Sequence, residues 1–114
     1  MIITGTKPFT EGQIEQLSEE FEVFIKTVID VERKICSAGA SRHYENEKVL
    51  LEQGSKQTTL WGGGVDLETK DVTIDSMINI RPSVGNRSNQ IQDPVIRQQF
   101  EDLTKYFFPT VFND

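Results

Sequence analysis

VFIKTVIDV, the segment from Val23 to Val31, is the part of the chain from which the fold can be worked out. Four of its nine residues are Val or Ile beyond the opening pair, and Lys26 and Asp30 interrupt the apolar run at even spacing. This density of β-branched residues favours a half-buried β-strand. A first helix that runs on through the segment is the alternative, which periodicity does not exclude and β-branching disfavours.

The residues before this segment predict a short strand and then a helix. Met1 to Thr4 is apolar and β-branched, which is typical of a strand. Thr10 is a good N-cap residue, and Gln13 three positions later can complete a capping box. We expect the helix that follows to end near Glu22.

The residues after the segment predict further short strands separated by polar loops. Ile35 to Ala38 continues as a strand, Ser41 to Lys48 is polar, and Val49 to Leu51 starts another apolar run. Thr59 to Trp61 is short and apolar. Gly62 to Gly64 comes next, and three consecutive glycines predict a very flexible backbone.

A β-hairpin is predicted between Val65 and Ile80, with a polar tip at Glu68 to Asp71. Residues of the second arm alternate between two faces, and the mainly apolar face holds Val72, Ile74, Ser76, Ile78 and Ile80. Asp93 followed by Pro94 then predicts the start of a C-terminal helix. The order of elements predicts an α+β fold, in which a meandering and mainly antiparallel sheet of about five strands carries an N-terminal and a C-terminal helix. We expect a single domain over residues 1–114.

Composition narrows the classes of function. The chain has 18 acidic and 12 basic residues and a net charge of −6, which disfavours general nucleic-acid binding. Its one cysteine, Cys36, can form neither an intrachain disulfide nor a multi-cysteine zinc site, and indicates a reducing compartment. The sequence has no signal-peptide pattern and no apolar run of membrane-span length. We therefore expect a cytoplasmic protein with no membrane partner and no cofactor.

Four motifs stand out along the chain: LLEQGSKQ (Leu50 to Gln57), LWG (Leu60 to Gly62), INIRPSVGNRS (Ile78 to Ser88) and IQDPVIR (Ile91 to Arg97). In this order they resemble a family of small bacterial domains of unknown function, and the resemblance spans most of residues 14 to 100. It implies no activity. The family pattern carries GGELH where this chain has GASRH, Gly39 to His43, so the resemblance assigns no role to that turn.

The candidate binding site is a polar groove formed by EQGSKQ (Glu52 to Gln57) and RPSVGNRS (Arg81 to Ser88). Two arginines, Arg81 and Arg87, bracket a loop that precedes a helix N-terminus, where free N–H groups and the helix dipole favour anions. Guanidinium groups match carboxylate and phosphate in geometry. The candidate ligand-binding residues are Arg81, Ser83, Asn86, Arg87, Ser88, Glu52, Ser55, Lys56 and Trp61.

These residues predict a pocket for an anionic small molecule. In the competing interpretation, Arg81 and Arg97 pair with acidic residues of the sheet. The side chains of Ser83, Asn86 and Ser88 then satisfy the backbone of turns. Trp61 could form the floor of a pocket, but an aromatic residue of the core or its rim is the favoured interpretation.

An enzyme is one alternative. Gly54 and Ser55 followed by Asp66 and Glu68, with Asp75 as a third carboxylate, loosely resemble the arrangement of Mg²⁺-dependent nucleotidyltransferases. A hydrolase would draw on Asp30, Glu32, Glu52 or Asp75.

His43, Glu45 and Glu47 form H-x-E-x-E, which on a strand would place three metal-binding groups on one face and on a loop would be a solvated polar run. Because no second histidine accompanies them, we expect no metal site. The other alternative is an interaction or regulatory module. The tail YFFPTVFND, Tyr106 to Asp114, is rich in aromatic residues, which suggests docking on the body or on the partner subunit of a homodimer.

Overall fold

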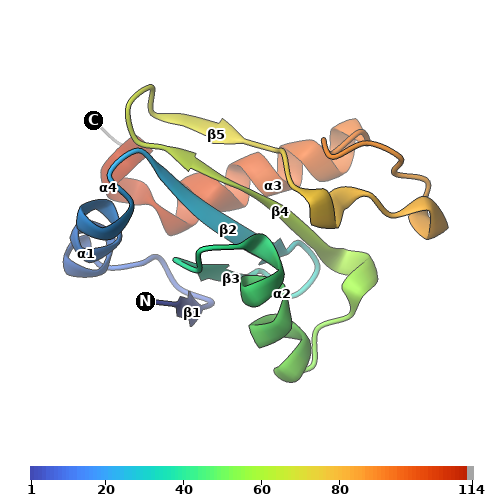
Figure 1. The fold of residues 1–114 in the computed structure, drawn as a ribbon, viewed down its shortest axis with the longest axis horizontal. Helices are drawn as coiled ribbons and strands as arrows, with labels where there is room; N and C mark the ends of the chain where they lie inside the picture. Colours follow the sequence, from blue (N-terminus) through green and yellow to red (C-terminus); the bar gives the residue numbers. More distant parts are fainter. Residues whose placement is uncertain (113–114) are drawn as a thin grey trace.

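Five antiparallel strands form the central sheet of the protein (Figure 1). The computed structural model describes residues 1–112. In order across the sheet, the strands are β1 (Ile3–Gly5), β3 (Ile35–Ala38), β2 (Phe24–Asp30), β4 (Leu60–Asp66) and β5 (Asp71–Thr73). All neighbouring strands pair antiparallel. The expected α+β fold with a mainly antiparallel sheet of about five strands is therefore confirmed.

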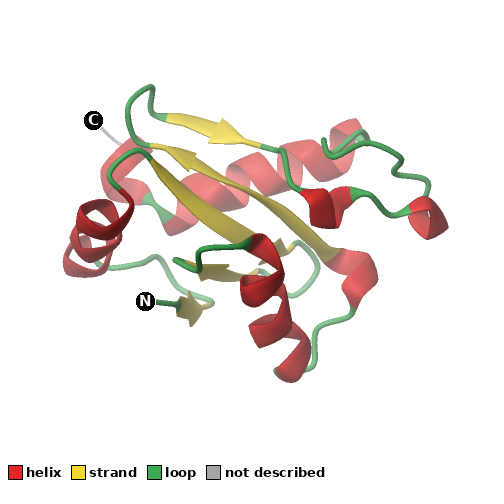
Figure 2. Ribbon diagram, in the orientation of Figure 1, coloured by secondary structure: helices red, strands yellow, loops and turns green. Residues whose placement is uncertain are grey.

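Helices cover both faces of this sheet (Figure 2). They are α1 (Glu11–Phe21), α2 (His43–Glu52), α3 (Pro94–Phe107) and α4 (Pro109–Phe112), with three short 3₁₀ helices, η1 (Gln57–Thr59), η2 (Met77–Asn79) and η3 (Pro82–Val84). In the view of Figure 1, α2 and η2 lie in front of the sheet and α3 lies behind it. The sequence predicts α1 and α3, whereas α2 is not expected from it.

The VFIKTVIDV segment forms β2, the strand at the centre of the sheet. Ile25 and Ile29 pack into the larger core with α1 and α3, whereas Val28 belongs to a smaller core under α2. Because both faces are covered, buried residues follow one another along the strand, and only Phe24 and Lys26 remain half-buried. The strand interpretation is confirmed, and the alternative of a continued helix is wrong.

Side-chain caps begin both of the expected helices. The hydroxyl of Thr10 accepts the N–H of Gln13 at 3.2 Å, and the side-chain oxygen of Gln13 accepts the N–H of Thr10 at 2.9 Å. The carboxylate of Asp93 accepts the N–H groups of Val95 and Ile96 at 2.8 and 3.2 Å. These bonds satisfy backbone donors that a helix start leaves without an intrahelical partner, which confirms both predicted starts.

Helix α2 replaces the polar loop and apolar run that the sequence predicts between Ser41 and Leu51. Its inward-facing residues include two polar ones, Asn46 and Glu47, beside the apolar Leu50. The amide oxygen of Asn46 accepts a hydrogen bond from the Ser37 hydroxyl at 3.2 Å, so this polar position is satisfied inside the protein. An inward face of mixed polarity hides the apolar stripe by which an amphipathic helix is recognised.

The three glycines belong to a central strand, which corrects the expectation of a flexible segment. Gly62, Gly63 and Gly64 lie inside β4, paired with β2. A Cβ atom on Gly62 would stand 2.7 Å from the Cβ of Ser76, and one on Gly63 would stand 2.8 Å from the ring of Phe100. The glycines therefore let η2 approach one face of the strand and α3 approach the other.

The second arm of the predicted hairpin is much shorter than expected. Strand β5 ends at Thr73, and the chain then turns into η2. The alternation predicted from Val72 to Ile80 fails, because Ile80 is 43% exposed and Asn79 is fully buried. The reason lies in the side chain of Asn79, which forms hydrogen bonds with the backbone of Gly62 in β4.

The aromatic tail docks on the body of its own chain. Phe107 and Phe108 are fully buried, with ring centroids 5.5 and 5.3 Å from that of Phe9. The N–H of Phe9 also donates to the carbonyl of Phe107 at 3.0 Å. Asn113 and Asp114 lie outside the described residues, and docking on a partner subunit stays a prediction.

Candidate functional site

Arg81 forms an ion pair with a carboxylate of the protein itself, that of Glu47. Its Nη2 lies 3.2 Å from Oε2 of Glu47 on α2 and donates to the carbonyl of Ile78 at 3.0 Å, while Nη1 donates to the carbonyl of Leu60 at 2.7 Å. The guanidinium carbon is 5.5 Å from the ring centroid of Trp61, and Arg81 is only 7% exposed. Burial raises the pKa of the Glu47 carboxyl, against the opposing effect of the Arg81 charge. The hydrogen bonds of this guanidinium are therefore made within the protein.

Two asparagines organise the loop between β5 and α3. The side chain of Asn79 accepts the N–H of Gly62 at 2.8 Å and donates to the carbonyl of Gly62 at 2.9 Å, so it pairs with β4 as a strand residue would. The side-chain nitrogen of Asn86 lies within 2.9 Å of the carbonyl oxygens of Asn79, Ser88 and Gln90. Asn86 thus satisfies the backbone of its own loop, whereas Asn79 fastens that loop to β4.

The two motifs of the predicted groove meet in space at Glu47. Arg81 of the second motif pairs with this carboxylate, and the side chain of Gln57 from the first motif is hydrogen-bonded to it. Ser55 is buried and accepts a hydrogen bond from Arg33 at 3.0 Å. Trp61 is buried in the larger core.

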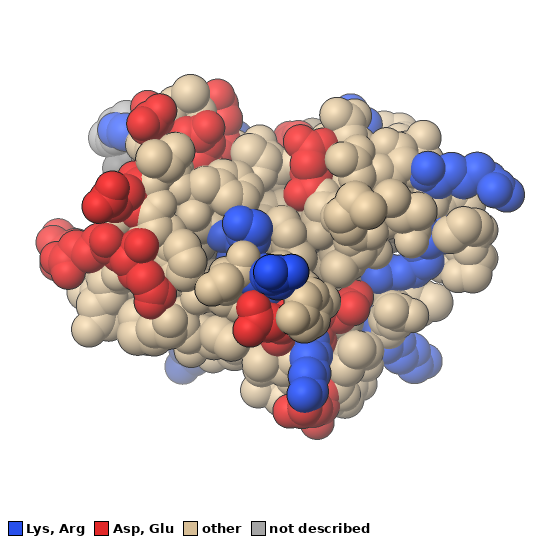
Figure 3. Space-filling view, in the orientation of Figure 1, with Lys and Arg blue, Asp and Glu red and all other residues tan. Residues whose placement is uncertain are grey.

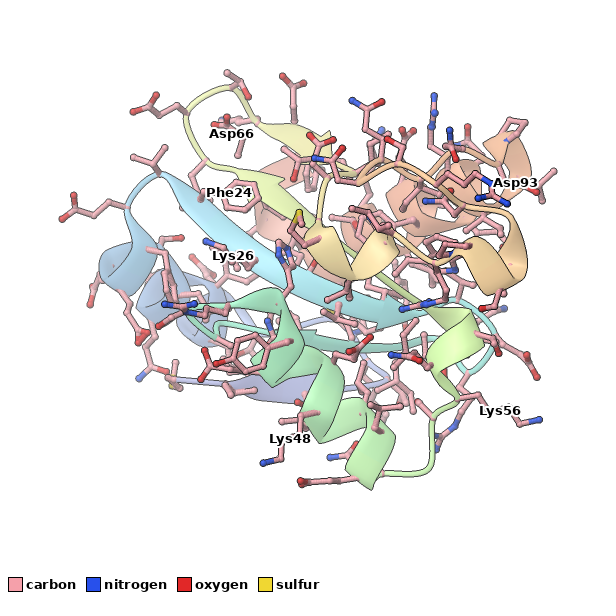
Figure 4. All side chains as sticks on the ribbon, turned by 45° about the vertical axis from the view of Figure 1, so that its right-hand side comes forward. Phe24, Lys26, Lys48, Lys56, Asp66 and Asp93 are labelled. Atoms are coloured by element: carbon pink, nitrogen blue, oxygen red, sulfur yellow. The ribbon has the colours of Figure 1, made fainter. Side chains whose placement is uncertain are left out.

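The other candidate residues lie at or near the surface. Ser88 is half-buried and accepts the N–H of Gln90 at 3.1 Å, whereas the exposed ones are Glu52, Lys56, Ser83 and Arg87. Figure 4 shows Lys56 directed away from the body of the protein. The structure therefore divides the predicted site into an inward-facing group and exposed single residues.

The groups required by the nucleotidyltransferase hypothesis lie at opposite ends of β4. Gly54 and Ser55 precede the strand, beside Arg33 of the β2–β3 turn, whereas Asp66 ends it (Figure 4). A strand of this length spans about 20 Å. The carboxylate of Asp66 instead accepts the N–H groups that follow it in the β4–β5 turn, at 3.0 and 3.1 Å. Within residues 1–112, no group of three His, Cys, Asp or Glu side chains could hold a metal ion.

A hollow of about 380 Å³ opens between the N-terminus of α2 and η2. Its lining residues are Lys26, Arg42, His43, Tyr44, Ser76, Met77 and Ile78. Two of these carry a positive charge, a third is a histidine, and none is Asp or Glu. We call this the basic hollow.

Lys26 lies on the part of β2 that α2 and η2 leave uncovered. It is half-buried, and its Nζ lies 5.6 Å from the ring centroid of Phe24. Figure 4 shows both side chains on the same stretch of the strand, far from Lys48 and Lys56. An ammonium group is costly to remove from water, and the basic hollow gives the side chain of this strand lysine an opening to solvent.

His43 is the first residue of α2 and is held by the backbone of β4. Its Nε2 lies 2.7 Å from the carbonyl oxygen of Gly63. Because a carbonyl only accepts hydrogen bonds, Nε2 carries the proton and Nδ1 is left as the second nitrogen. Burial lowers the pKa of His43, the bond to Gly63 raises it, and the charge of Lys26 lowers it further. The net shift is downward, so the ring is mainly neutral at pH 7.

The start of α2 adds a partial positive charge to the basic hollow. Arg42 occupies the N-cap position with an extended backbone and makes no side-chain capping bond. The first N–H groups of a helix without such a cap have no intrahelical acceptor, and the helix dipole is positive there. Arg42, His43 and Tyr44 all line the hollow, so this end of the helix borders it.

The distribution of charge sets the basic hollow apart from the rest of the surface. Figure 3 shows acidic side chains gathered at the end of the molecule formed by α1 and the β4–β5 turn. Basic ones lie in the middle and toward the right and lower edges of the same face, with some acidic ones among them. The acidic end includes Glu11, Glu15 and Glu19 of α1. An acidic protein therefore presents a local cationic concavity, which is the arrangement that attracts an anion.

Sequence reasoning misses most residues of this hollow. It considers His43 only as a metal ligand and names neither Arg42, Tyr44 nor Met77 as a site residue. The one residue of the hollow that the sequence could have pointed to is Lys26, because it is a charged residue in a strand whose other positions are apolar or buried. The rest depends on α2 and η2 meeting over β2, which no local pattern shows.

Residues 1–107 match the model of a family described as a protein of unknown function, DUF5674. The chain belongs to the DUF5674 family. This confirms the resemblance to a family of unknown function. No curated protein and no solved structure matches the chain. Membership in DUF5674 assigns no activity. Among residues 1–112, no helix is long and apolar enough to span a membrane.

Proposed function

We propose that the protein binds an anionic small molecule in the basic hollow. The observation that carries this proposal is the lining, where Lys26, Arg42 and His43 converge without a carboxylate in a chain of net charge −6. Positive charges that line one hollow repel each other, and a bound anion offsets that repulsion. The volume lies within the range of small-molecule sites, roughly 300–1,000 Å³.

Anion binding is the function expected from the sequence, but we assign it to different residues. Arg81, the main candidate in the sequence, is compensated by Glu47 and by two carbonyl groups. Its guanidinium would have to break buried bonds to meet a ligand, at a cost that a solvent-facing cation does not have. Lys26 and Arg42 have no such competing carboxylate among the residues that line the hollow.

Thermal unfolding in the presence of single anions tests the proposal. A ligand that binds only the folded state stabilises it by RT ln(1 + [L]/Kd), about 2.7 kcal/mol at a hundred times Kd. We expect phosphate or acetate to raise the melting temperature at constant ionic strength, and Lys26→Ala with Arg42→Ala to abolish the rise.

Lys48→Ala with Lys56→Ala is the matched control, because it removes the same number of positive charges from exposed positions away from the hollow (Figure 4). Loss of the effect in the control as well would mean that the anions act through net charge alone. If neither anion stabilises the wild-type protein, the proposal is wrong.

A further inference from the structure

We propose that the ligand of the basic hollow is amphipathic, with a carboxylate or phosphate head joined to a flat apolar body. This inference rests on the proposed function and specifies the class of molecule bound. The head faces Lys26, Arg42 and His43, and the body packs on Tyr44, Met77 and Ile78, which line the same hollow.

The apolar part of the lining is unusually open to water. Met77 is 75% exposed and Tyr44 is 58% exposed, although both are large side chains that gain from burial. They belong to different elements, η2 and α2, and both border the hollow. Methionine adapts its shape to a ligand, and tyrosine offers a ring face for stacking. The surface therefore has the composition of a contact made with an apolar partner.

The size of the hollow favours a molecule larger than an inorganic ion. A water molecule occupies about 30 Å³ in the liquid. In a space of about 380 Å³, an ion the size of phosphate would leave most of the volume filled with water. It would also leave the side chains of Tyr44 and Met77 as exposed as before. A ring-sized body attached to the anion fills this volume and removes both side chains from water.

Polar groups at the base of the hollow orient the head. Ser76 is 5% exposed, and its hydroxyl oxygen accepts the N–H of Ile78 at 3.3 Å, which leaves the hydroxyl proton available as a donor. The Nδ1 atom of His43 becomes a second donor when the ring is protonated, since Nε2 is held by Gly63. Ser76 and His43 therefore supply hydrogen-bond donors for the head within the same lining that holds the apolar side chains.

Five small probes separate the contributions of head and body. Acetate and phosphate carry the head alone, phenylacetate and phenyl phosphate carry the head and a ring, and phenylacetamide carries the ring without a charge. Calorimetric titration of the wild-type protein should show the ring-bearing anions binding roughly tenfold or more tightly than acetate and phosphate, which corresponds to about 1.4 kcal/mol. Phenylacetamide should bind more weakly than phenylacetate.

Substitutions then assign the two ends of the ligand to the two sides of the hollow. Met77→Ala with Tyr44→Ala should remove the advantage of the ring-bearing anions and leave the binding of acetate and phosphate unchanged. Lys26→Ala with Arg42→Ala should weaken all four anions. Val95→Ala is the control for loss of an exposed apolar side chain, because Val95 is 66% exposed on α3, and it should change none of the affinities.

The outcomes distinguish this inference from the function on which it rests. If acetate and phosphate bind through Lys26 and Arg42 but the ring adds nothing, the amphipathic ligand is wrong and anion binding stands. If phenylacetamide equals phenylacetate, the head is not recognised, and both proposals are wrong. If a hexaglutamate peptide binds more tightly than every ring-bearing anion, the occupant is an acidic chain and the inference is overturned. If no probe binds, the proposed anion binding and the amphipathic ligand are both wrong.

Discussion

The carboxylate of Glu47 on α2 meets the guanidinium of Arg81 in the loop after η2, with 3.2 Å between Oε2 and Nη2 and both side chains buried. The two residues are 34 positions apart in the sequence. This ion pair connects α2 to the loop that follows η2. Helix α2 and η2 are the two elements that border the basic hollow. The ion pair is therefore structural, and it positions the candidate site without belonging to it.

Removing one partner of this ion pair should destabilise the protein strongly. We expect Arg81→Ala to lower the free energy of unfolding by about 3–5 kcal/mol, because Glu47 then remains as an uncompensated buried charge. The double variant Arg81→Met with Glu47→Leu should recover much of that loss. Urea denaturation measures both. A loss below about 1 kcal/mol in Arg81→Ala, which is typical of a surface pair, would contradict the buried role.

Replacing Asn79 by aspartate, which has nearly the same shape, should destabilise the protein. Asn79→Asp keeps the shape but loses the N–H donors that bond to the carbonyls of Gly62, Ile74 and Asn89 at 2.9 to 3.1 Å. The three carbonyl groups would then lack a donor and face a carboxylate. We expect the free energy of unfolding to fall by about 3 kcal/mol or more. Hydrogen exchange should show faster opening at the Gly62 N–H, and an unchanged rate there would refute this role. Asn89→Asp, at an exposed position, is the control.

A methyl group on the central glycines should disturb the packing of both faces of the sheet. Gly62→Ala would place a Cβ 2.7 Å from that of Ser76, and Gly63→Ala would place one 2.8 Å from the Phe100 ring. Each should cost about 1–3 kcal/mol through overpacking. Gly12→Ala in α1 meets nothing within 4 Å and should instead stabilise by up to about 1 kcal/mol. Thermal unfolding of the three variants measures whether Gly62→Ala and Gly63→Ala are less stable than Gly12→Ala. Equal melting temperatures would argue against the close approach of Ser76 and Phe100 to β4.

Protonation of His43 should reduce stability at low pH. The pKa of His43 is lowered from 6.5 in the folded protein, so between that lowered pKa and 6.5 the unfolded chain binds more protons than the folded one. The stability linked to His43 is therefore present above about pH 6.5 and is lost as the pH falls through this window. His43→Gln keeps a donor for Gly63 but does not titrate, and its stability should fall less steeply from pH 7.5 to 5. If the stabilities of wild type and His43→Gln fall equally with pH, protonation of His43 is not linked to unfolding.

Binding of an anion should depend on the same proton. An anion in the basic hollow favours the charged form of His43, so acetate or phosphate should bind more tightly at pH 5.5 than at pH 7.5. Calorimetric titration of wild type and His43→Gln at the two pH values separates this effect from titration of phosphate itself, because both proteins share the ligand. Equal pH dependence in the two proteins would exclude His43 from the binding site.

Local patterns correctly predict an antiparallel sheet of about five strands, the strand β2 and the two capped helices. The capping box of Thr10 and Gln13 and the cap of Asp93 involve residues within three positions of each other, so the sequence contains both partners. Helix α2 is missed because Asn46 and Glu47 point inward, and their partners lie on other elements. The same holds for Asn79, whose bonds to β4 end the expected alternation.

The sequence alone determined that VFIKTVIDV contains a strand, that capped helices follow Thr10 and Asp93, and that the fold is α+β, because these depend on β-branching and on bonds between near neighbours. Only the tertiary structure decided that Arg81 faces Glu47 and that Gly62 to Gly64 form a strand. It also brought Lys26, Arg42 and His43 together beside Tyr44 and Met77. The physical reason is that a buried charge or a close backbone approach is settled by partners far away in the chain, which no local pattern encodes.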